Sequence, residues 1–188
     1  MIWNDHSKLR GQHALLSPSQ PSWLNYDISK LFNFLNNVKA KERGTRLHKF
    51  AQDCIELERW LPKEPSDTLS LYVNDAISFN MKPEQVLYYS KNLFGTADAI
   101  SFSNDSLLRI HDLKTGTIPG KMEQLLIYDA LFCLEYDIKP EDIGHSLRIY
   151  QFDDFTETEP QADEVRRVMD QIVYFDELLL LREEEDNE

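Results

Sequence analysis

The fold is decided by residues 94–114, whose sequence is FGTADAISFSNDSLLRIHDLK. Its two arms, 94–102 and 107–114, are rich in apolar residues and resemble strands bounded by turn residues. Between them lies Ser103-Asn104-Asp105-Ser106, and all four residues are of types that favour turns. The stretch therefore predicts two antiparallel strands joined by a hairpin turn.

The register of this hairpin decides where its charged side chains lie. A three-residue turn centred on Asp105 would place Asp98 directly opposite Asp112. Lys114 lies two residues beyond Asp112, so strand alternation points it to the same face. Two carboxylates and one ammonium are therefore expected together. Taken alone, the three residues are equally well explained as a cross-strand ion pair on the surface.

Helices and a further strand are expected before the hairpin. Apolar periodicity predicts helices over 28–38 and 45–61, with Gly44 breaking the pattern between them and the prolines after Leu61 ending the second. A loop is expected over 80–83 and a strand over 86–90. Asp67 can cap a third helix, whose apolar face holds Leu69, Tyr72, Val73, Ala76 and Ile77.

Helix and strand also alternate after the hairpin. Residues 123–136 are apolar nearly all round, as in a helix packed across a sheet, and a further strand is expected over 146–152. Residues 182–188 are expected to fray as an acidic tail. Pro160 is expected to begin a last helix, with an inner stripe of Val165, Val168, Met169, Ile172, Phe175 and Leu179. The fold class is α/β, a small mixed β-sheet flanked by helices in a single domain of 188 residues.

Four short segments carry side chains with complementary chemistry. Together they supply a neutral imidazole, two carboxylates and an ammonium, which can hold Mg(II) or Mn(II) beside a phosphodiester. Each spacing alone is weak evidence, and their order makes the case. The segments are Gly44-Thr45-Arg46-Leu47-His48, Gly95-Thr96-Ala97-Asp98, Asp112-Leu113-Lys114-Thr115-Gly116 and Gln124-Leu125-Leu126-Ile127-Tyr128.

These segments resemble the RecB-type branch of the PD-(D/E)XK nuclease superfamily, which includes stand-alone members in phages and CRISPR systems. In that branch a helix carries Gly-x-x-x-His, a strand Gly-x-x-Asp, the next strand (Asp/Glu)-x-Lys, and a following helix Gln-x-x-x-Tyr. The resemblance runs from about Leu16 to Tyr136, because Leu16-Ser17-Pro18-Ser19 followed by Trp23-Leu24 is similar to a Leu-Ser-x-Ser opening common there. It implies a restriction-endonuclease-like core with a metal site at the edge of the sheet.

The chemistry gives each charged residue an expected role. Asp98 and Asp112 would be metal ligands, and the resemblance implies the backbone carbonyl of Leu113 as another. Lys114 would orient water and stabilise charge, since an ordinary lysine is too basic to be a free general base. His48 would bind metal through a neutral ring nitrogen, which favours Mn(II) over Mg(II) more than carboxylates do. The alternative for His48 is a polar residue at a helix boundary.

Four further residues are candidates for supporting the site or binding substrate. Gln124 and Tyr128 are one helical turn apart and face one direction, so they could hold the 112–114 strand or contact a DNA phosphate. Their alternative is a buried pair that satisfies backbone groups. Arg46 and Lys121 are candidates for phosphate contact, with simple solvation as the alternative.

Two departures from the branch bear on the chemistry. Asp112-Leu113-Lys114 stands where Glu-x-Lys is common, which shortens one ligand arm and keeps its charge. Many relatives also carry four cysteines for an iron–sulfur cluster, whereas this chain has only Cys54 and Cys133. Two thiolates cannot form a four-thiolate site, so no iron–sulfur cluster is expected.

The distribution of charge limits how DNA could be held. The chain has a formal net charge of -13, and residues 153–188 alone carry fourteen acids against three bases. The preceding 152 residues are therefore close to neutral. Because affinity for DNA comes largely from neutralised phosphates, tight unaided binding is not expected.

The leading expectation is a metal-dependent DNA nuclease, an exonuclease acting at DNA ends in phage or bacterial recombination, replication or repair, by analogy with the family. One alternative is a nuclease-fold protein that binds DNA or a recombination or replication partner, with the acidic C-terminal helix, about 160–188, as docking surface. Another is an endonuclease in a larger complex. Neither a run of eighteen apolar residues nor a signal-like stretch over 1–16 is present, so a cytoplasmic protein without membrane contact is expected.

Overall fold

The computed structural model describes residues 5, 7–9, 11–12, 14–63, 67–103 and 106–186. The chain divides into two compact units, Met1–Arg43 and Gly44–Glu188. The first unit holds two 3-10 helices, η1 (Ser7–Leu9) and η2 (Pro21–Asn25), and the beginning of the first α-helix. The indole Nε1 of Trp23 donates to the Ser17 carbonyl at 2.9 Å, so the residues of the Leu-Ser-x-Ser opening fold onto η2.

Helix α1 (Ile28–Glu56) runs without interruption through Gly44, so the predicted break there is wrong. A single glycine costs a helix only about 1 kcal/mol relative to alanine, which does not end it. The predicted end at Leu61 is also wrong. Glu58 takes a left-handed φ of 48°, its N–H donates to Ile55 and the Arg59 N–H donates to Cys54, a Schellman closure that ends the helix before the prolines.

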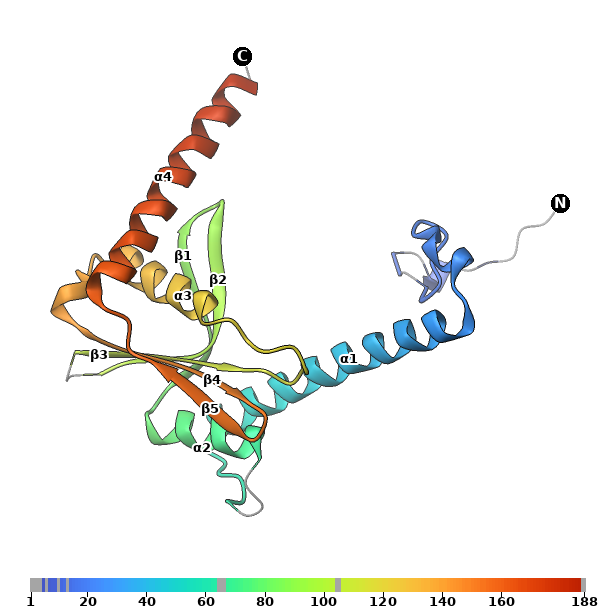
Figure 1. Ribbon diagram of the computed structural model, residues 1–188, viewed down its shortest axis with the longest axis horizontal. Helices are drawn as coiled ribbons and strands as arrows, with labels where there is room; N and C mark the ends of the chain where they lie inside the picture. Colours follow the sequence, from blue (N-terminus) through green and yellow to red (C-terminus); the bar gives the residue numbers. More distant parts are fainter. Residues whose placement is uncertain are drawn as a thin grey trace. The chain divides into compact units, whose positions relative to one another are not determined.

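Five strands form one mixed sheet in the second unit, in the spatial order β1-β2-β3-β4-β5. Only the β3–β4 pair is parallel, and the crossover between these two strands contains α3 (Figure 1). The α/β class with a small mixed sheet is thus confirmed. The strands are β1 (Lys82–Ser90), β2 (Leu93–Phe102), β3 (Leu107–Leu113), β4 (Gly144–Gln151) and β5 (Asp154–Thr158).

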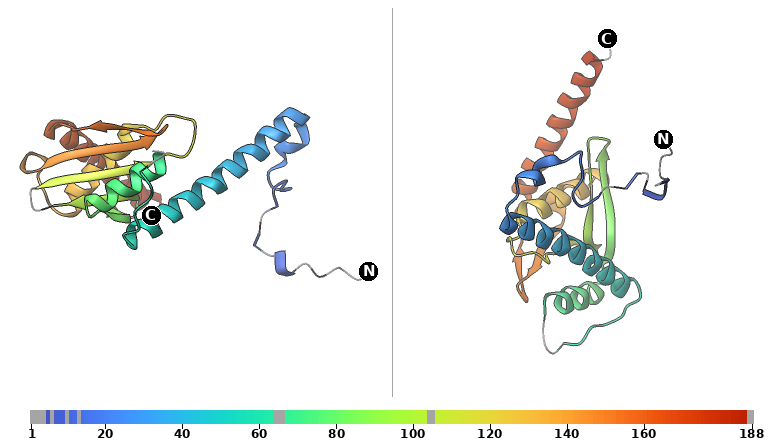
Figure 2. Two further views of the ribbon diagram at one scale, coloured as in Figure 1. Left: turned by 90° about the horizontal axis from the view of Figure 1, so that it is seen from below. Right: turned by 90° about the vertical axis from the view of Figure 1, so that its right-hand side faces the viewer.

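Helices cover both faces of the sheet (Figures 1 and 2). Helix α2 (Thr68–Ser78) packs on β3 and β4, and Asp67 caps it as predicted by accepting the Ser70 N–H at 2.7 Å. Helices α3 (Met122–Glu135) and α4 (Ala162–Asp186) lie on the other face. A 3-10 helix, η3 (Pro140–Asp142), lies between α3 and β4. Two separate cores result. One includes Leu87, Ile110, Leu125, Leu131, Leu147 and Val165, and the other Ala51, Cys54, Tyr72, Val73, Leu113 and Tyr150.

The predicted register of the central hairpin is confirmed. Ala99 pairs with His111 and Phe102 with Leu108, which is the alignment expected from a turn centred between them. Asn104 and Asp105, the centre of that turn, lie outside the described residues. The alignment matters because continuing it by one residue brings Asp98 beside Asp112.

Further differences from expectation concern β1, β5 and α4. Strand β1 begins at Lys82, inside the predicted loop, and Pro83 is tolerated because β1 is an edge strand. Strand β5 was not predicted, because its turn is Phe152-Asp153, with φ of 58° and 60° but without Gly or Asn. Helix α4 begins at Ala162 rather than Pro160.

The last helix is longer and more exposed than the sequence suggests. Residues 182–186 are helical where fraying was expected, and Lys91 pairs with Glu183, while residues 187–188 lie outside the description. Val165 and Ile172 of the predicted inner stripe are buried, but Phe175 and Leu179 are 53% and 50% exposed. The inner stripe is therefore correct only for the first half of α4. Among the described helices, none is both long and apolar enough to cross a membrane.

Candidate metal centre

Asp98 occupies the centre of the candidate site, on the face of β2 that α1 approaches. Its Oδ2 accepts the Leu113 N–H at 2.9 Å and lies 3.4 Å from Nδ1 of His48. Burial and the neighbouring Asp112 charge raise the pKa of Asp98 to about 6, although His48 opposes the shift. A carboxylate held in this way is short of compensating positive charge.

Asp112 and Lys114 form a tight pair next to Asp98. Asp112 is 3% exposed, and Nζ of Lys114 lies 3.0 Å from its Oδ1 and 2.9 Å from its Oδ2. The Oδ2 atom is buried and has no well-directed hydrogen bond among the described residues. An acceptor lone pair on Asp112 is therefore free to bind a cation in addition to Lys114.

Gln124 of α3 fixes the position of the lysine. Its Oε1 accepts a hydrogen bond from Nζ of Lys114 at 3.0 Å. Of the two roles considered for Gln124, contact with the 112–114 strand is thus the one that the structure contains. Lys114 is held between the Asp112 carboxylate and the Gln124 amide, which limits its movement.

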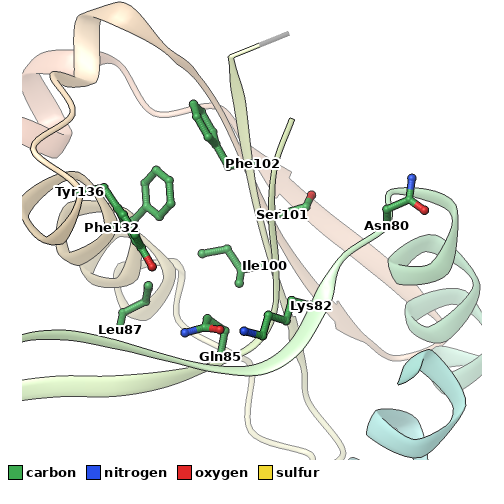
Figure 3. A pocket seen from close by; sticks show the side chains of 9 residues that line it. All are labelled: Asn80, Lys82, Gln85, Leu87, Ile100, Ser101, Phe102, Phe132 and Tyr136. Carbon is green, nitrogen blue, oxygen red and sulfur yellow. The ribbon is translucent and has the colours of Figure 1, made fainter. Parts of the chain in front are cut away.

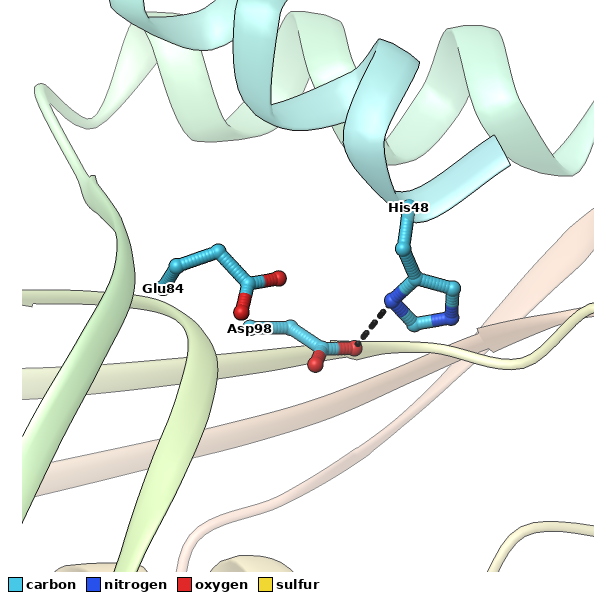
Figure 4. A group of neighbouring side chains, drawn as sticks. All are labelled: His48, Glu84 and Asp98. Atoms are coloured by element: carbon cyan, nitrogen blue, oxygen red, sulfur yellow. Dashed lines mark ion pairs between the residues drawn. The ribbon is translucent and has the colours of Figure 1, made fainter. Parts of the chain in front are cut away.

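Glu84 joins the site, although sequence reasoning did not select it. Ligand atoms of His48, Glu84 and Asp98 all lie within 4.8 Å of one another (Figure 4). The flanking pairs Pro83–Ala99 and Gln85–Ala97 place Glu84 across from Asp98. Glu84 has a φ of 50°, and a non-glycine residue in this region stores of order 1 kcal/mol or more of strain. The signal that would have found it is the β1–β2 register, which local patterns do not supply.

The glycines of the motifs permit close approaches around the site. A Cβ on Gly95 would lie 2.8 Å from Cε1 of Tyr128, so the Tyr128 ring packs against β2 at this glycine. A Cβ on Gly44 would lie 2.9 Å from Oγ1 of Thr115. The first motif therefore contacts the third, and the second contacts the fourth, which explains why glycine suits both positions.

Three predicted residues remain, one buried and two exposed. Leu113 is buried at the end of β3, with its N–H held by Asp98. Arg46 is exposed on α1, and Lys121 is exposed at the position before α3. The two cysteines are far from forming one site, because Cys54 and Cys133 belong to different cores.

A separate pocket of about 310 Å³ lies on the α3 side of β1 and β2 (Figure 3). Leu87, Ile100 and Phe132 belong to the core that α3 covers, and Lys82 is the one charged side chain among the nine that line the pocket. Because none of the nine lining residues is acidic, this pocket is a poor cation site. None of the candidate ligands His48, Glu84 and Asp98 lines this pocket.

The chemistry of the donors fits a hard divalent cation. Glu84 and Asp98 offer carboxylate oxygens and His48 offers one ring nitrogen, a set that suits Mg(II) or Mn(II), whereas Asp112 is not part of this group of three. The raised pKa of Asp98 indicates negative charge that its neighbours do not fully compensate. The residues present therefore fit such an ion.

The raised pKa of Asp98 predicts an unusual pH dependence of stability without metal. The unfolded carboxyl titrates near 3.8 and the folded one near 6, so the folded state binds the proton more tightly. Stability should therefore rise as pH falls from about 7 to about 4. Asp98→Asn keeps an oxygen for Leu113 and should remove this contribution, which is at most about 2–3 kcal/mol. Urea unfolding in EDTA at several pH values gives the free energy of unfolding of wild-type protein and of Asp98→Asn. The same dependence on pH in both proteins would contradict the prediction.

The chain was compared with protein-family models, curated proteins and solved structures. No family model, curated protein or solved structure matches the chain.

Proposed function

We propose that this chain is a metal-dependent DNA nuclease with a restriction-endonuclease-like core of the PD-(D/E)XK type. The observation that supports the proposal best is the convergence of Asp98, Asp112 and Lys114 on one face of the sheet, with Lys114 held by Gln124. A simple surface ion pair would not require a carboxylate that is 3% exposed. Nor would it account for His48 and Glu84 beside Asp98.

In the proposed reaction, Asp98 and Asp112 would hold Mg(II) or Mn(II), with His48 and Glu84 as further ligands. When bound, the ion supplies an activated water and neutralises the phosphoryl oxygens. The Lys114 ammonium would donate a hydrogen bond to the attacking water or to the phosphate, adding positive charge where negative charge develops. Gln124 would keep Nζ of Lys114 in place, and Tyr128 would support β2 through Gly95.

End-specific cleavage is the proposed mode, in DNA recombination, replication or repair. The test compares end-labelled linear DNA with covalently closed circles, each with Mg(II), Mn(II) or EDTA. Loss of linear DNA alone, and only with metal, is the expected result. Cutting of the circle would favour an endonuclease instead, and the absence of any cleavage under all conditions would contradict the proposal.

The exposed end of α4 favours a second candidate, a nuclease-fold protein that mainly binds DNA or a recombination partner. Figure 1 shows this end of α4 extending past α3. Its apolar side chains are 40% to 58% exposed and precede Glu183 and Glu185, a combination suited to docking. Binding of DNA or of such a partner without cleavage would favour this candidate. The exposed residues are Tyr174, Phe175, Leu178, Leu179, Leu180 and Leu181.

His48 is expected to influence the choice of metal. His48→Ala should weaken Mn(II) binding more than Mg(II) binding, because imidazole nitrogen prefers the softer of the two ions. Calorimetric titration of both ions into wild-type and variant protein measures this difference. A loss of equal size for both ions would mean that His48 acts through packing or substrate contact.

A further inference from the structure

Two aromatic rings are exposed side by side on the β1–β2 hairpin. Tyr88 and Phe94 are 51% and 61% exposed, and they are directly paired across the two strands. Their ring centroids lie 6.3 Å apart, with an angle of 27° between the planes. The rings are therefore nearly parallel and present flat apolar surface to solvent.

The pair lies on the same face of the hairpin as the candidate metal ligands. Gly95 and Leu87 face α3, because Gly95 abuts Tyr128 and Leu87 is buried in the core beneath that helix. Their neighbours Phe94 and Tyr88 therefore point to the other face. Along this face the paired positions run from Tyr88 and Phe94 at one end to Glu84 and Asp98 at the other.

We propose that Tyr88 and Phe94 form a stacking platform for bases of a single nucleic-acid strand whose phosphodiester lies at Asp98 and Asp112. The inference rests on the proposed nuclease function and adds a substrate-binding site to it. Nucleobases stack on aromatic side chains in proteins that bind single strands, and every base offers a flat face. A planar ligand suits two parallel rings on an open strand surface, where no enclosing pocket is needed.

The spacing between platform and metal ligands fits a short length of strand. Phe94 precedes Asp98 by four residues, which is about 13 Å at the rise of a β-strand. At about 3.4 Å per nucleotide of a B-form strand this distance corresponds to roughly four nucleotides, and to fewer in a stretched strand. Bases about two to four nucleotides from the cleaved bond would therefore reach the rings.

The charge of the protein favours stacking as a source of affinity. With a formal net charge of -13, the chain has little capacity to bind DNA by neutralising phosphates. Lys91, next to this pair at the tip of the hairpin, is paired with Glu183. Stacking on Tyr88 and Phe94 does not depend on a positive surface and is correspondingly less sensitive to salt.

The test measures binding and cleavage separately. Fluorescence anisotropy in EDTA gives the affinity for a labelled single-stranded 12-nucleotide DNA, and its RNA counterpart shows whether the platform distinguishes the sugar. Tyr88→Ala and Phe94→Ala should each bind about tenfold more weakly, as expected for loss of one stacked base. Tyr88→Phe and Phe94→Tyr keep the rings and should bind normally. Phe152→Ala removes a ring that is 63% exposed at the turn between β4 and β5, and it is the matched control.

A single abasic site moved along the DNA locates the platform. Wild-type protein should lose about tenfold in affinity when the abasic site falls at the stacked nucleotide, whereas Phe94→Ala should be insensitive to it. Unchanged binding by both alanine variants overturns the platform, even if cleavage by wild-type protein depends on Asp112. Failure of wild-type protein to cleave any substrate overturns the proposed function, and the anisotropy measurements still decide whether the rings bind a strand.

Discussion

Asp98→Ala and Asp112→Ala are each expected to lower the rate of DNA cleavage by at least about a thousandfold. Each removes a carboxylate that would hold the metal, and several kcal/mol of charge stabilisation correspond to that factor at about 1.4 kcal/mol per tenfold. Asp98→Ala should not destabilise the protein, because burial already opposes the ionised form of Asp98. Initial rates on end-labelled DNA at saturating Mn(II) measure the effect.

Two controls separate chemistry from folding in this experiment. Asp154→Ala removes an exposed carboxylate at the start of β5 and should cleave normally. Lys114→Ala should also abolish cleavage, yet it leaves Asp112 buried without its cation, so its thermal unfolding must be measured alongside. Folded Asp98→Ala and Asp112→Ala proteins that cut at the wild-type rate would eliminate the assigned site.

The central hairpin was predictable because its information is local. A short turn and an alternation of two residues were enough to align Ala99 with His111, and hence to bring Asp98, Asp112 and Lys114 together. The position of Gln124 followed from its separation by one helical turn from Tyr128, although its hydrogen bond to Lys114 depends on how α3 packs across the sheet. Local sequence patterns were therefore enough to predict that Asp98, Asp112 and Lys114 lie together.

The parts that sequence reasoning missed depend on tertiary structure. Glu84 reaches Asp98 only through the β1–β2 register and a left-handed backbone conformation. Glutamate rarely adopts this conformation, so the residue type does not predict it. Gly44 was expected to end a helix, but α1 continues and the missing Cβ accommodates Thr115 from a distant loop. In both cases a contact between distant segments outweighed the local preference.

A buried pair far from the candidate metal centre is expected to dominate the stability of the second unit. Asp129 of α3 is fully buried, and its carboxylate oxygens lie 2.8 Å and 3.0 Å from Nδ1 of His145 on β4. Nε2 of His145 lies 3.0 Å from the Pro140 carbonyl, which can only accept, so this nitrogen carries a proton. The pair of Asp129 and His145 joins α3 to β4.

His145→Ala should lower the free energy of unfolding by about 3–5 kcal/mol, because it leaves the Asp129 carboxylate buried without its partner. Burial opposes the charged imidazolium, but the hydrogen bond and charge of Asp129 outweigh it and raise the pKa of His145. The raised pKa means that the stabilisation is fully present below the unfolded value near 6.5 and is lost as pH rises through the folded value. Urea unfolding from pH 5 to pH 9 should show this loss in wild-type protein. Because burial raises the pKa of Asp129, His145→Ala keeps a pH dependence of its own, and the variant that should lack the loss is the one without both partners.

The double variant Asp129→Leu/His145→Leu identifies the cause of the effect. Replacing both charged partners by apolar side chains of similar volume removes the desolvation cost, so the double variant should be far more stable than His145→Ala. It should also lack the decline in stability at high pH. A double variant as unstable as the single one would mean that shape complementarity between α3 and β4, rather than an unpaired charge at Asp129, causes the loss.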